Sequence, residues 1–221
     1  MKNIDCTDIV LIGDRKNSKN VIIWFHGYGA NNWDMEPVME MLNMVCNNSF
    51  FILLPNAPVV NGKRSWYPLP NTNHDNVIVE DYDGLISTHE KVKKFITEFK
   101  DNNPNLFDKK KIIFGGFSQG GALALSLHLA SNIPSLGGIS IAGYMPCANH
   151  FEHIDMSDKK IFLAHGEKDL TISIDTHHKT LRFLKQKNVD VSEFTSIFGH
   201  TMTKEVIMKT SYWLKNYCGS L

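Results

Sequence analysis

Runs of consecutive apolar residues recur along the chain and alternate with longer stretches in which apolar residues return every three to four positions. The runs at 21–25 and 50–54 contain no polar residue, a pattern typical of parallel strands that are covered on both faces. The longer stretches have the period of helices with one buried face. Strands are expected at residues 8–12, 21–25, 50–54, 111–114, 137–141, 160–164 and 191–197, and helices at 35–46, 79–100, 119–130, 176–187 and 201–217.

Strands that alternate with helices predict βαβ units and a mostly parallel, twisted sheet flanked by helices. The 221 residues, of which 43% are hydrophobic, suit one compact core. No internal repeat, low-complexity tract or linker divides the sequence, so we expect residues 1–221 to form a single α/β domain. The longest irregular stretch, 55–76, is rich in proline, and loops of that length are usually functional or mobile.

Charge and cysteine content narrow the class of protein. The 23 basic and 23 acidic residues cancel, which favours neither nucleic acid nor an anionic membrane as a partner. The first twenty residues lack the apolar core of a signal peptide, and no apolar run approaches the ~18 residues of a membrane span. Four scattered cysteines without metal-ligand spacing indicate free thiols in a reducing compartment. We therefore expect a cytoplasmic protein without stable membrane insertion.

The junction at Ser118 breaks the pattern of good helix formers. Each glycine disfavours helix by about 1 kcal/mol relative to alanine, yet Gly116, Gly120 and Gly121 surround the start of the helix predicted at 119. Small neighbours allow a serine to occupy a sharp, strained turn between strand and helix, which exposes its hydroxyl as a nucleophile above the sheet. The alternative is a glycine-rich turn that only lets the helix pack closely on the strand.

A nucleophilic serine needs a base and an orienting acid, which follow it in the chain order serine, acid, histidine in enzymes with this turn. Asp169 lies just beyond the strand predicted at 160–164, and His200 just beyond the one at 191–197. Both positions fall at the carboxyl edge of a parallel sheet, where such folds keep their sites. Glu167 and Asp175 are alternative acids. The sequence therefore predicts a triad of Ser118, Asp169 and His200.

Acyl transfer also needs two N–H groups that stabilise the oxyanion. One is expected from Gln119, which follows the nucleophile, and the other from a loop after an early strand. The glycine-spaced residues 26–30 follow the strand at 21–25, so Tyr28 is the second candidate donor. The alternative interpretation of this loop is a simple glycine-rich turn.

Taken together, these segments resemble the acyl-protein thioesterase, or phospholipase/carboxylesterase, family of α/β hydrolases over nearly the whole chain. The Gly-Phe-Ser-Gln-Gly-Gly and Gly-Tyr-Met-Pro segments are the most specific of them. The matching segments are His26-Gly27-Tyr28-Gly29, Pro55-Asn56-Ala57-Pro58, Arg64-Ser65-Trp66-Tyr67, Gly116 to Gly121, Gly143-Tyr144-Met145-Pro146, His165-Gly166-x-x-Asp169 and Gly199-His200.

The resemblance implies an α/β-hydrolase fold and a serine hydrolase of carboxylic esters or thioesters that uses no metal or other cofactor. It also implies that the regions around Trp66 and Met145 flank the substrate. Two departures from the family pattern bear on chain length: the loop from Ala57 to Arg64 is shorter than in eukaryotic thioesterases, and residues 170–173 lack the usual Val-Pro.

The expected substrate is a small ester or acyl thioester. The sequence between residues 141 and 164 leaves no room for a cap domain, so the site should open to solvent between apolar walls. With the shortened loop, we expect short to medium acyl chains to be preferred, and a monomer or weak homodimer. The predicted walls are Trp66, Leu69, Met145 and Leu170.

Three other functions compete with this one. The first is an acyl-protein thioesterase or lysophospholipase that acts on long acyl chains. The second, from another class, is a catalytically inactive α/β-hydrolase that serves as a binding module, although such proteins normally lose a member of the triad. The third is a peptidase of the same fold, which usually needs an added domain or a cap.

Overall fold

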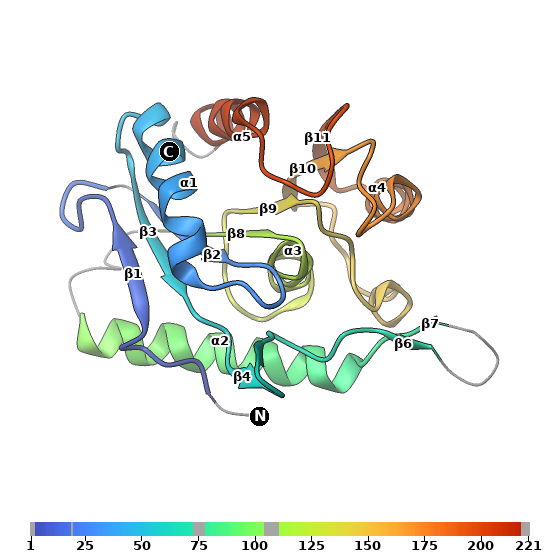
Figure 1. The fold of residues 1–221 in the computed structure, drawn as a ribbon, viewed down its shortest axis with the longest axis horizontal. Coiled ribbons are helices and arrows are strands. Elements are labelled where there is room, and N and C mark those ends of the chain that lie inside the picture. Colours follow the sequence, from blue (N-terminus) through green and yellow to red (C-terminus); the bar gives the residue numbers. More distant parts are fainter. Residues whose placement is uncertain (1–2, 19, 73–77, 104–110, 218–221) are drawn as a thin grey trace.

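A seven-stranded sheet forms the centre of the computed structural model, which describes residues 3–18, 20–72, 78–103 and 111–217 (Figure 1). The order of its strands is β1-β3-β2-β8-β9-β10-β11. Only β1 runs antiparallel to its neighbour, so the expected mostly parallel sheet is confirmed. The strands are β1 (Ile9–Ile12), β2 (Asn20–Phe25), β3 (Phe50–Pro55), β8 (Lys111–Phe117), β9 (Gly137–Ile141), β10 (Lys160–Gly166) and β11 (Asp190–Ser196).

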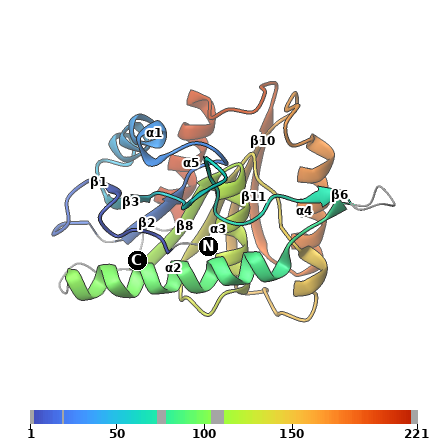
Figure 2. The same ribbon diagram turned by 60° about the horizontal axis from the view of Figure 1, so that its bottom comes forward.

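Within the described residues, five helices cover the two faces of this sheet. Figures 1 and 2 show α1 and α5 side by side on one face, with α2 along the other. The expected flanking helices are therefore confirmed. The helices are α1 (Asn32–Val45), α2 (Tyr82–Asn102), α3 (Gln119–Ala130), α4 (Ile174–Gln186) and α5 (Lys204–Tyr217).

Successive residues of the central strands belong to different apolar clusters. In β2, Val21, Ile23 and Phe25 join the cluster formed with α2, α3 and α4, whereas Ile22 and Trp24 join the cluster formed with α1 and α5. Side chains of a strand alternate between faces, so a strand buried on both faces needs apolar residues at every position. This double burial explains why these strands read as unbroken apolar runs.

Polar side chains set two helix starts that the apolar periodicity placed a few residues away. Helix α1 begins at Asn32 rather than 35, because Asn31 caps it and exchanges hydrogen bonds with Asp34 in a capping box. Helix α2 begins at Tyr82 rather than 79, because the Asp81 carboxylate accepts the N–H of Gly84. A capping side chain fixes the first turn more sharply than hydrophobic spacing does.

The stretch 55–76, expected to be irregular, contains short paired strands where it is described. Val59–Val60 (β4) pairs with Lys63–Arg64 (β5), and Asn71–Thr72 (β6) pairs with Ile78–Val79 (β7). Asn61 and Gly62 join β4 to β5 with positive φ angles of 51° and 77°. Asn-Gly is the preferred sequence for a two-residue hairpin turn, so this local signal could have predicted the hairpin.

The sequence also predicted free thiols, a connection from β9 to β10 without a cap domain, and no membrane span. Cys6, Cys46 and Cys147 are free thiols, and Cys218 lies outside the described residues. In the described part of the chain, the connection from β9 to β10 carries a single 3-10 turn, η1 (Ala148–Phe151). None of the described helices is both long and apolar enough to span a membrane.

Three buried histidines make stability depend on pH. Burial lowers the pKa of His26, His89 and His128 to about 4, below the ~6.5 of an unfolded chain. Unfolding therefore takes up protons between pH 6.5 and 4, so the folded state loses stability as the pH falls through that window. We expect each histidine to contribute a slope of up to about 1.4 kcal/mol per pH unit, measured by urea unfolding at pH 7, 6 and 5.

A single substitution measures the contribution of one of these histidines to the pH dependence of stability. His89 lies between α2 and α3 and contacts the Ser126 hydroxyl at 2.9 Å. His89→Leu should lower the pH slope by the contribution of one histidine, up to about 1.4 kcal/mol per pH unit, while leaving the transition cooperative. A free energy of unfolding that stays constant from pH 7 to 5 in the unaltered chain would contradict this prediction.

Candidate active site

Ser118 occupies the sharp turn between β8 and α3 with φ 55° and ψ −122°, a conformation that L residues rarely adopt. Its N–H donates to the Ile141 carbonyl at 2.9 Å, and its own carbonyl accepts the N–H of Ala122 at 3.0 Å. These bonds hold the strained residue between the end of β9 and the first turn of α3. The serine therefore lies at the edge of the sheet that is formed by the carboxyl ends of the parallel strands.

Backbone contacts explain the glycines around Ser118. A Cβ on Gly116 would lie 2.2 Å from the Gly120 carbonyl oxygen, and one on Gly120 would lie 2.1 Å from the Phe25 carbonyl oxygen. Real Cβ atoms essentially never approach so closely. The glycines therefore let α3 start directly against β8 and the end of β2, and this close approach offsets their poor helix propensity.

The predicted residues Ser118, His200 and Asp169 are joined by hydrogen bonds. Nε2 of His200 lies 2.9 Å from the Ser118 hydroxyl, and its Nδ1 lies 2.6 Å from Oδ2 of Asp169. The other oxygen of Asp169 accepts the N–H groups of Thr171 at 2.8 Å and Ile172 at 2.9 Å. The loops after β10 and β11 thus bring acid and histidine to the serine.

These contacts determine where the protons lie. Burial disfavours the charged carboxylate of Asp169, but the hydrogen bonds from His200, Ile172 and Thr171 outweigh it and hold its pKa below the usual range. Asp169 is therefore ionised at neutral pH and can only accept, so Nδ1 of His200 carries the proton. Nε2 is left with a lone pair that faces the serine hydroxyl.

Nearby titratable groups do not share this position. Glu167 and Asp175, the alternative acids, are exposed, and neither carboxylate accepts a hydrogen bond from any described residue. His165 is buried, and its Nε2 lies 2.8 Å from the Ile172 carbonyl and 3.5 Å from Oδ2 of Asp169. Burial lowers the pKa of His165, so it is a neutral ring packed behind the acid.

The loop after β2 lies against the nucleophile. A Cβ on Gly27 would be 3.3 Å from Cβ of Ser118, and Gly29 adopts a left-handed φ of 76°. The N–H of Gly29 donates to the Arg64 carbonyl at 2.8 Å. Over the described residues, the backbone N–H groups of Tyr28 and Gln119 donate to no protein acceptor, so both are available to an oxyanion.

The side chain of Gln119 has a role that sequence reasoning missed. Its oxygen accepts the N–H of Trp66 at 3.1 Å, and its nitrogen donates to the Ser65 hydroxyl at 3.1 Å and the Tyr67 carbonyl at 2.7 Å. The residue after the nucleophile therefore anchors the segment 65–67 by three hydrogen bonds. The amide side chain directly after the predicted nucleophile is the signal for this role that the sequence contains.

Two of the four predicted substrate walls, Trp66 and Met145, are almost fully buried. Trp66 is 1% exposed, because its ring packs edge-on against Phe25 and its indole N–H donates to the His26 carbonyl at 2.8 Å. Met145 is 5% exposed within the same apolar cluster. Both residues stay predicted substrate contacts, although little of either side chain is exposed. Leu69 and Leu170 are 41% and 99% exposed and stay candidates for substrate contact.

A resident metal ion would need a cluster of ligating side chains. The described ranges, which omit residues 73–77, 104–110 and both chain ends, contain no group of three or more His, Cys, Asp or Glu residues arranged to hold one. Ser118, Asp169 and His200 are instead paired with one another, and Asp169 also with backbone groups.

Several known proteins are similar to this chain over most of its length. Acyl-protein thioesterase 1 of Candida albicans is 27% identical over 220 residues, covering 90% of this chain and 93% of that protein. Acyl-protein thioesterase 1 homolog 1 of Dictyostelium discoideum is 27% identical over 207 residues, 86% of this chain and 88% of that one. The crystal structure of the Bacillus cereus carboxylesterase superposes with a TM-score of 0.77 at 21% identity, covering 95% and 93% of the two chains.

The family comparison agrees with the fold. The model of the Phospholipase/Carboxylesterase family matches residues 7–217, from before β1 to the end of α5. The solved structures share the α/β-hydrolase fold, with its mostly parallel sheet flanked by helices. Since the match spans nearly the whole sequence and includes every element of the site, the chain belongs to the phospholipase/carboxylesterase family of α/β hydrolases.

Proposed function

We propose that this hydrolase cleaves carboxylic esters and acyl thioesters through Ser118 as nucleophile, His200 as general base and acid, and Asp169 as the orienting acid. The hydrogen-bond chain of 2.9 Å and 2.6 Å that joins these three side chains is the observation that carries the proposal. A histidine within hydrogen-bond reach of a serine, itself oriented by a buried carboxylate, is the arrangement that activates a hydroxyl at neutral pH.

The reaction follows from the proton positions. The Ser118 oxygen attacks the carbonyl carbon while its proton passes to Nε2 of His200, and the Asp169 carboxylate stabilises the resulting imidazolium. His200 then gives this proton to the departing alcohol or thiol, which leaves an acyl-enzyme. Water attacks the acyl-enzyme with His200 again as base, which releases the carboxylic acid and restores the serine.

The oxyanion formed in both steps would accept hydrogen bonds from the N–H groups of Tyr28 and Gln119. Such donors act because they are fixed before the charge develops, and losing one typically costs about 10²–10³ in rate. The strained turn fixes Gln119, and the contact of Gly27 with Ser118 keeps the loop of Tyr28 beside the nucleophile. An inactive binding module would not need these two N–H groups to stay unpaired.

The length of the acyl chain distinguishes the two candidate substrate classes. The tight β4–β5 hairpin and the open position of Leu170 favour short to medium acyl chains, because they leave little structure to cover a long one. The similarity to the acyl-protein thioesterases of Candida albicans and Dictyostelium discoideum supports the alternative, hydrolysis of acyl thioesters on proteins. We propose a short to medium chain preference, with long-chain thioester hydrolysis as the alternative.

Ser118→Ala should abolish ester hydrolysis and leave folding intact, because it removes one hydroxyl oxygen and no backbone bond. The expected loss of kcat is about 10³-fold or more, measured with p-nitrophenyl butyrate. A fluorophosphonate probe should label the unaltered protein at one site and leave the variant unlabelled. An unaltered protein that neither reacts with the probe nor turns over esters would favour the inactive binding module.

Asp169→Asn should lower kcat steeply, by about 10³–10⁴-fold, with a small change in KM. An amide at this position can donate to Nδ1 of His200 and so stabilise the wrong tautomer. Glu167→Gln is the matched control, since its carboxylate lies two residues away, is exposed, and should be dispensable. Equal losses in the two variants would remove Asp169 from the proposed triad.

The acyl preference is tested by kcat/KM across p-nitrophenyl esters from C2 to C16, below their micelle thresholds, together with a palmitoylated peptide thioester. Each acyl methylene that is buried against an apolar side chain should add up to about 0.8 kcal/mol to the binding free energy, until the acyl chain extends past the apolar surface. We expect an optimum at short to medium length. An optimum at C14–C16, or efficient depalmitoylation, would establish the long-chain alternative.

A further inference from the structure

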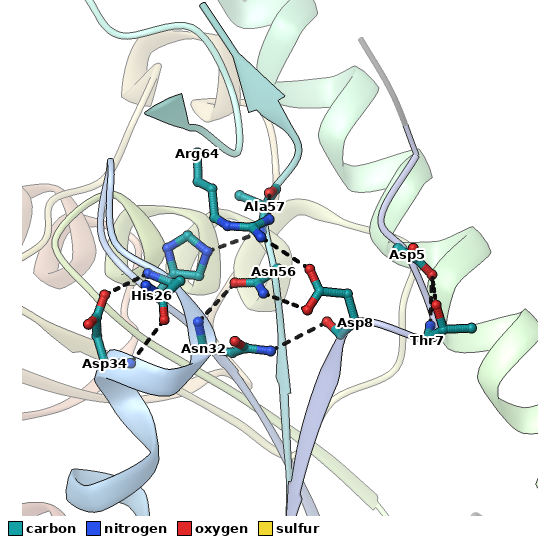
Figure 3. A network of polar contacts seen from close by, with 10 residues as sticks. Asp5, Thr7, Asp8, His26, Asn32, Asp34, Asn56, Ala57 and Arg64 are labelled. Atoms are coloured by element: carbon teal, nitrogen blue, oxygen red, sulfur yellow. Dashed lines mark hydrogen bonds and ion pairs between the residues drawn. The ribbon is translucent and has the colours of Figure 1, made fainter. Parts of the chain in front are cut away.

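A network of polar contacts joins Asp8, Asn56 and Arg64 to His26 and Asn32, the residues at the two ends of the loop that carries Tyr28 (Figure 3). We infer that Arg64, held in place by Asp8, is a positioning residue that sets the Tyr28 N–H relative to Ser118. This inference rests on the proposed function, because it concerns the second donor of the proposed oxyanion hole. Figure 3 shows the Arg64 guanidinium between Ala57 and Asp8, to which it donates, so we infer that it acts through the backbone rather than on substrate.

Arg64 is joined to the Tyr28 loop through its backbone and to the core through its side chain. Its carbonyl accepts the N–H of Gly29 at 2.8 Å, one residue beyond Tyr28. Its guanidinium donates to the Ala57 carbonyl at 2.9 Å and to Oδ2 of Asp8 at 3.2 Å. Where the guanidinium is anchored therefore determines where the acceptor for Gly29 lies.

The same network holds the far end of this loop. Oδ1 of Asp8 accepts the side-chain N–H of Asn56 at 2.9 Å, and the Asn56 oxygen accepts the backbone N–H of Asn32 at 2.8 Å. Asn32 is the first residue of α1, so the acid that anchors Arg64 also fixes the point where the loop enters the helix.

The near end is fixed from the same segment. The N–H of Ala57 donates to Nε2 of His26 at 3.0 Å, which leaves the proton on Nδ1, 2.7 Å from the Gly27 carbonyl. The indole N–H of Trp66 donates to the His26 carbonyl. Residues 26–32 are therefore held at both ends and, through Gly29, in the middle.

This arrangement differs from a salt bridge that merely stabilises the fold. The Arg64 and Asp8 side chains are 29% and 41% exposed, and an ion pair so accessible to water contributes little stability. The hairpin that carries Arg64 has only two ladder pairs, Val59 with Arg64 and Val60 with Lys63. Without the guanidinium, the carbonyl that accepts from Gly29 would be held by this short ladder and by the bonds of the following residues 65–67 to Pro58 and Gln119. Those bonds preserve the fold of the segment, so the position of the carbonyl should change more than the stability of the protein.

The test compares Arg64→Met with a control that disturbs the fold elsewhere. Arg64→Met keeps the aliphatic stem and removes both guanidinium bonds. Asn43→Ala is the control. The buried Asn43 side chain pairs with the backbone N–H and carbonyl of Phe50, which begins β3. This is the amino end of the strand, opposite the carboxyl ends at which Ser118, Asp169 and His200 lie. The measurements are kcat, KM, melting temperature and the affinity for a trifluoromethyl ketone, whose adduct with the serine places an oxyanion between the two donors.

We expect Arg64→Met to lower kcat about 10-fold with KM changed less than about 2-fold, since misplacing a donor should cost part of what its removal does. Affinity for the trifluoromethyl ketone should weaken by a similar factor. Asn43→Ala should lower the melting temperature at least as much while leaving kcat and ketone affinity unchanged. Asp8→Asn, which leaves Arg64 itself intact, should lower kcat about 3-fold, and Asp8→Asn with Arg64→Met should lose no more than Arg64→Met alone.

Separate results would overturn the inference and the proposed function. If the unaltered enzyme is labelled at Ser118 and active, but Arg64→Met and Asp8→Asn keep kcat and ketone affinity, the positioning role is wrong and the proposed function stands. Losses in the two single variants that multiply in the double variant would also contradict it. If Arg64→Met does not fold, Asp8→Asn alone decides. An unaltered protein inert to the fluorophosphonate probe would instead remove the proposed function itself.

Discussion

The close approach of the first turn of α3 to the ends of β8 and β2 is the constraint on which the site depends. At Gly120 the carbonyls of Phe25 and His26 come so near that a methyl group could not fit, and at Gly116 the backbone of Gly120 leaves no more room. This contact forces Ser118 into a conformation that costs on the order of 1–3 kcal/mol. The surrounding sheet tolerates that strain because its strands are buried on both faces and cannot shift to relieve it.

The same contact couples two parts of the molecule that are distant in sequence. His26 follows the strand against which Gly120 packs, so the loop that carries Tyr28 starts where α3 starts. The Gln119 side chain then binds residues 65–67, and Trp66 in turn binds the His26 carbonyl. The two N–H groups proposed for the oxyanion hole are therefore linked by one set of buried contacts. Preorganisation of this kind is what makes such donors effective in catalysis.

The sequence predicted this architecture closely because its information is local. Double burial requires unbroken apolar strands, and the glycines around Ser118 report a steric demand that no other residue meets. The positions of Asp169 and His200 followed from the rule that strand ends share an edge of the sheet. The burial of Trp66 and the link from Asp8 to Arg64 could not be predicted, because they depend on how a proline-rich segment folds back over a distant strand.

The hydrolytic step and the choice of substrate therefore depend on different parts of the molecule, the first on the strands and the second on the loops. The proposed triad lies at the ends of parallel strands whose register the core determines, so its geometry depends little on the loops around it. The surroundings of the scissile bond depend instead on residues 55–70, where the Asn-Gly hairpin and the Arg64 anchor are properties of loops. Loops change length at little thermodynamic cost. Substrate choice in this protein can therefore diverge from that of its relatives while the hydrolytic step is kept, and the β4–β5 hairpin is where such divergence would be found.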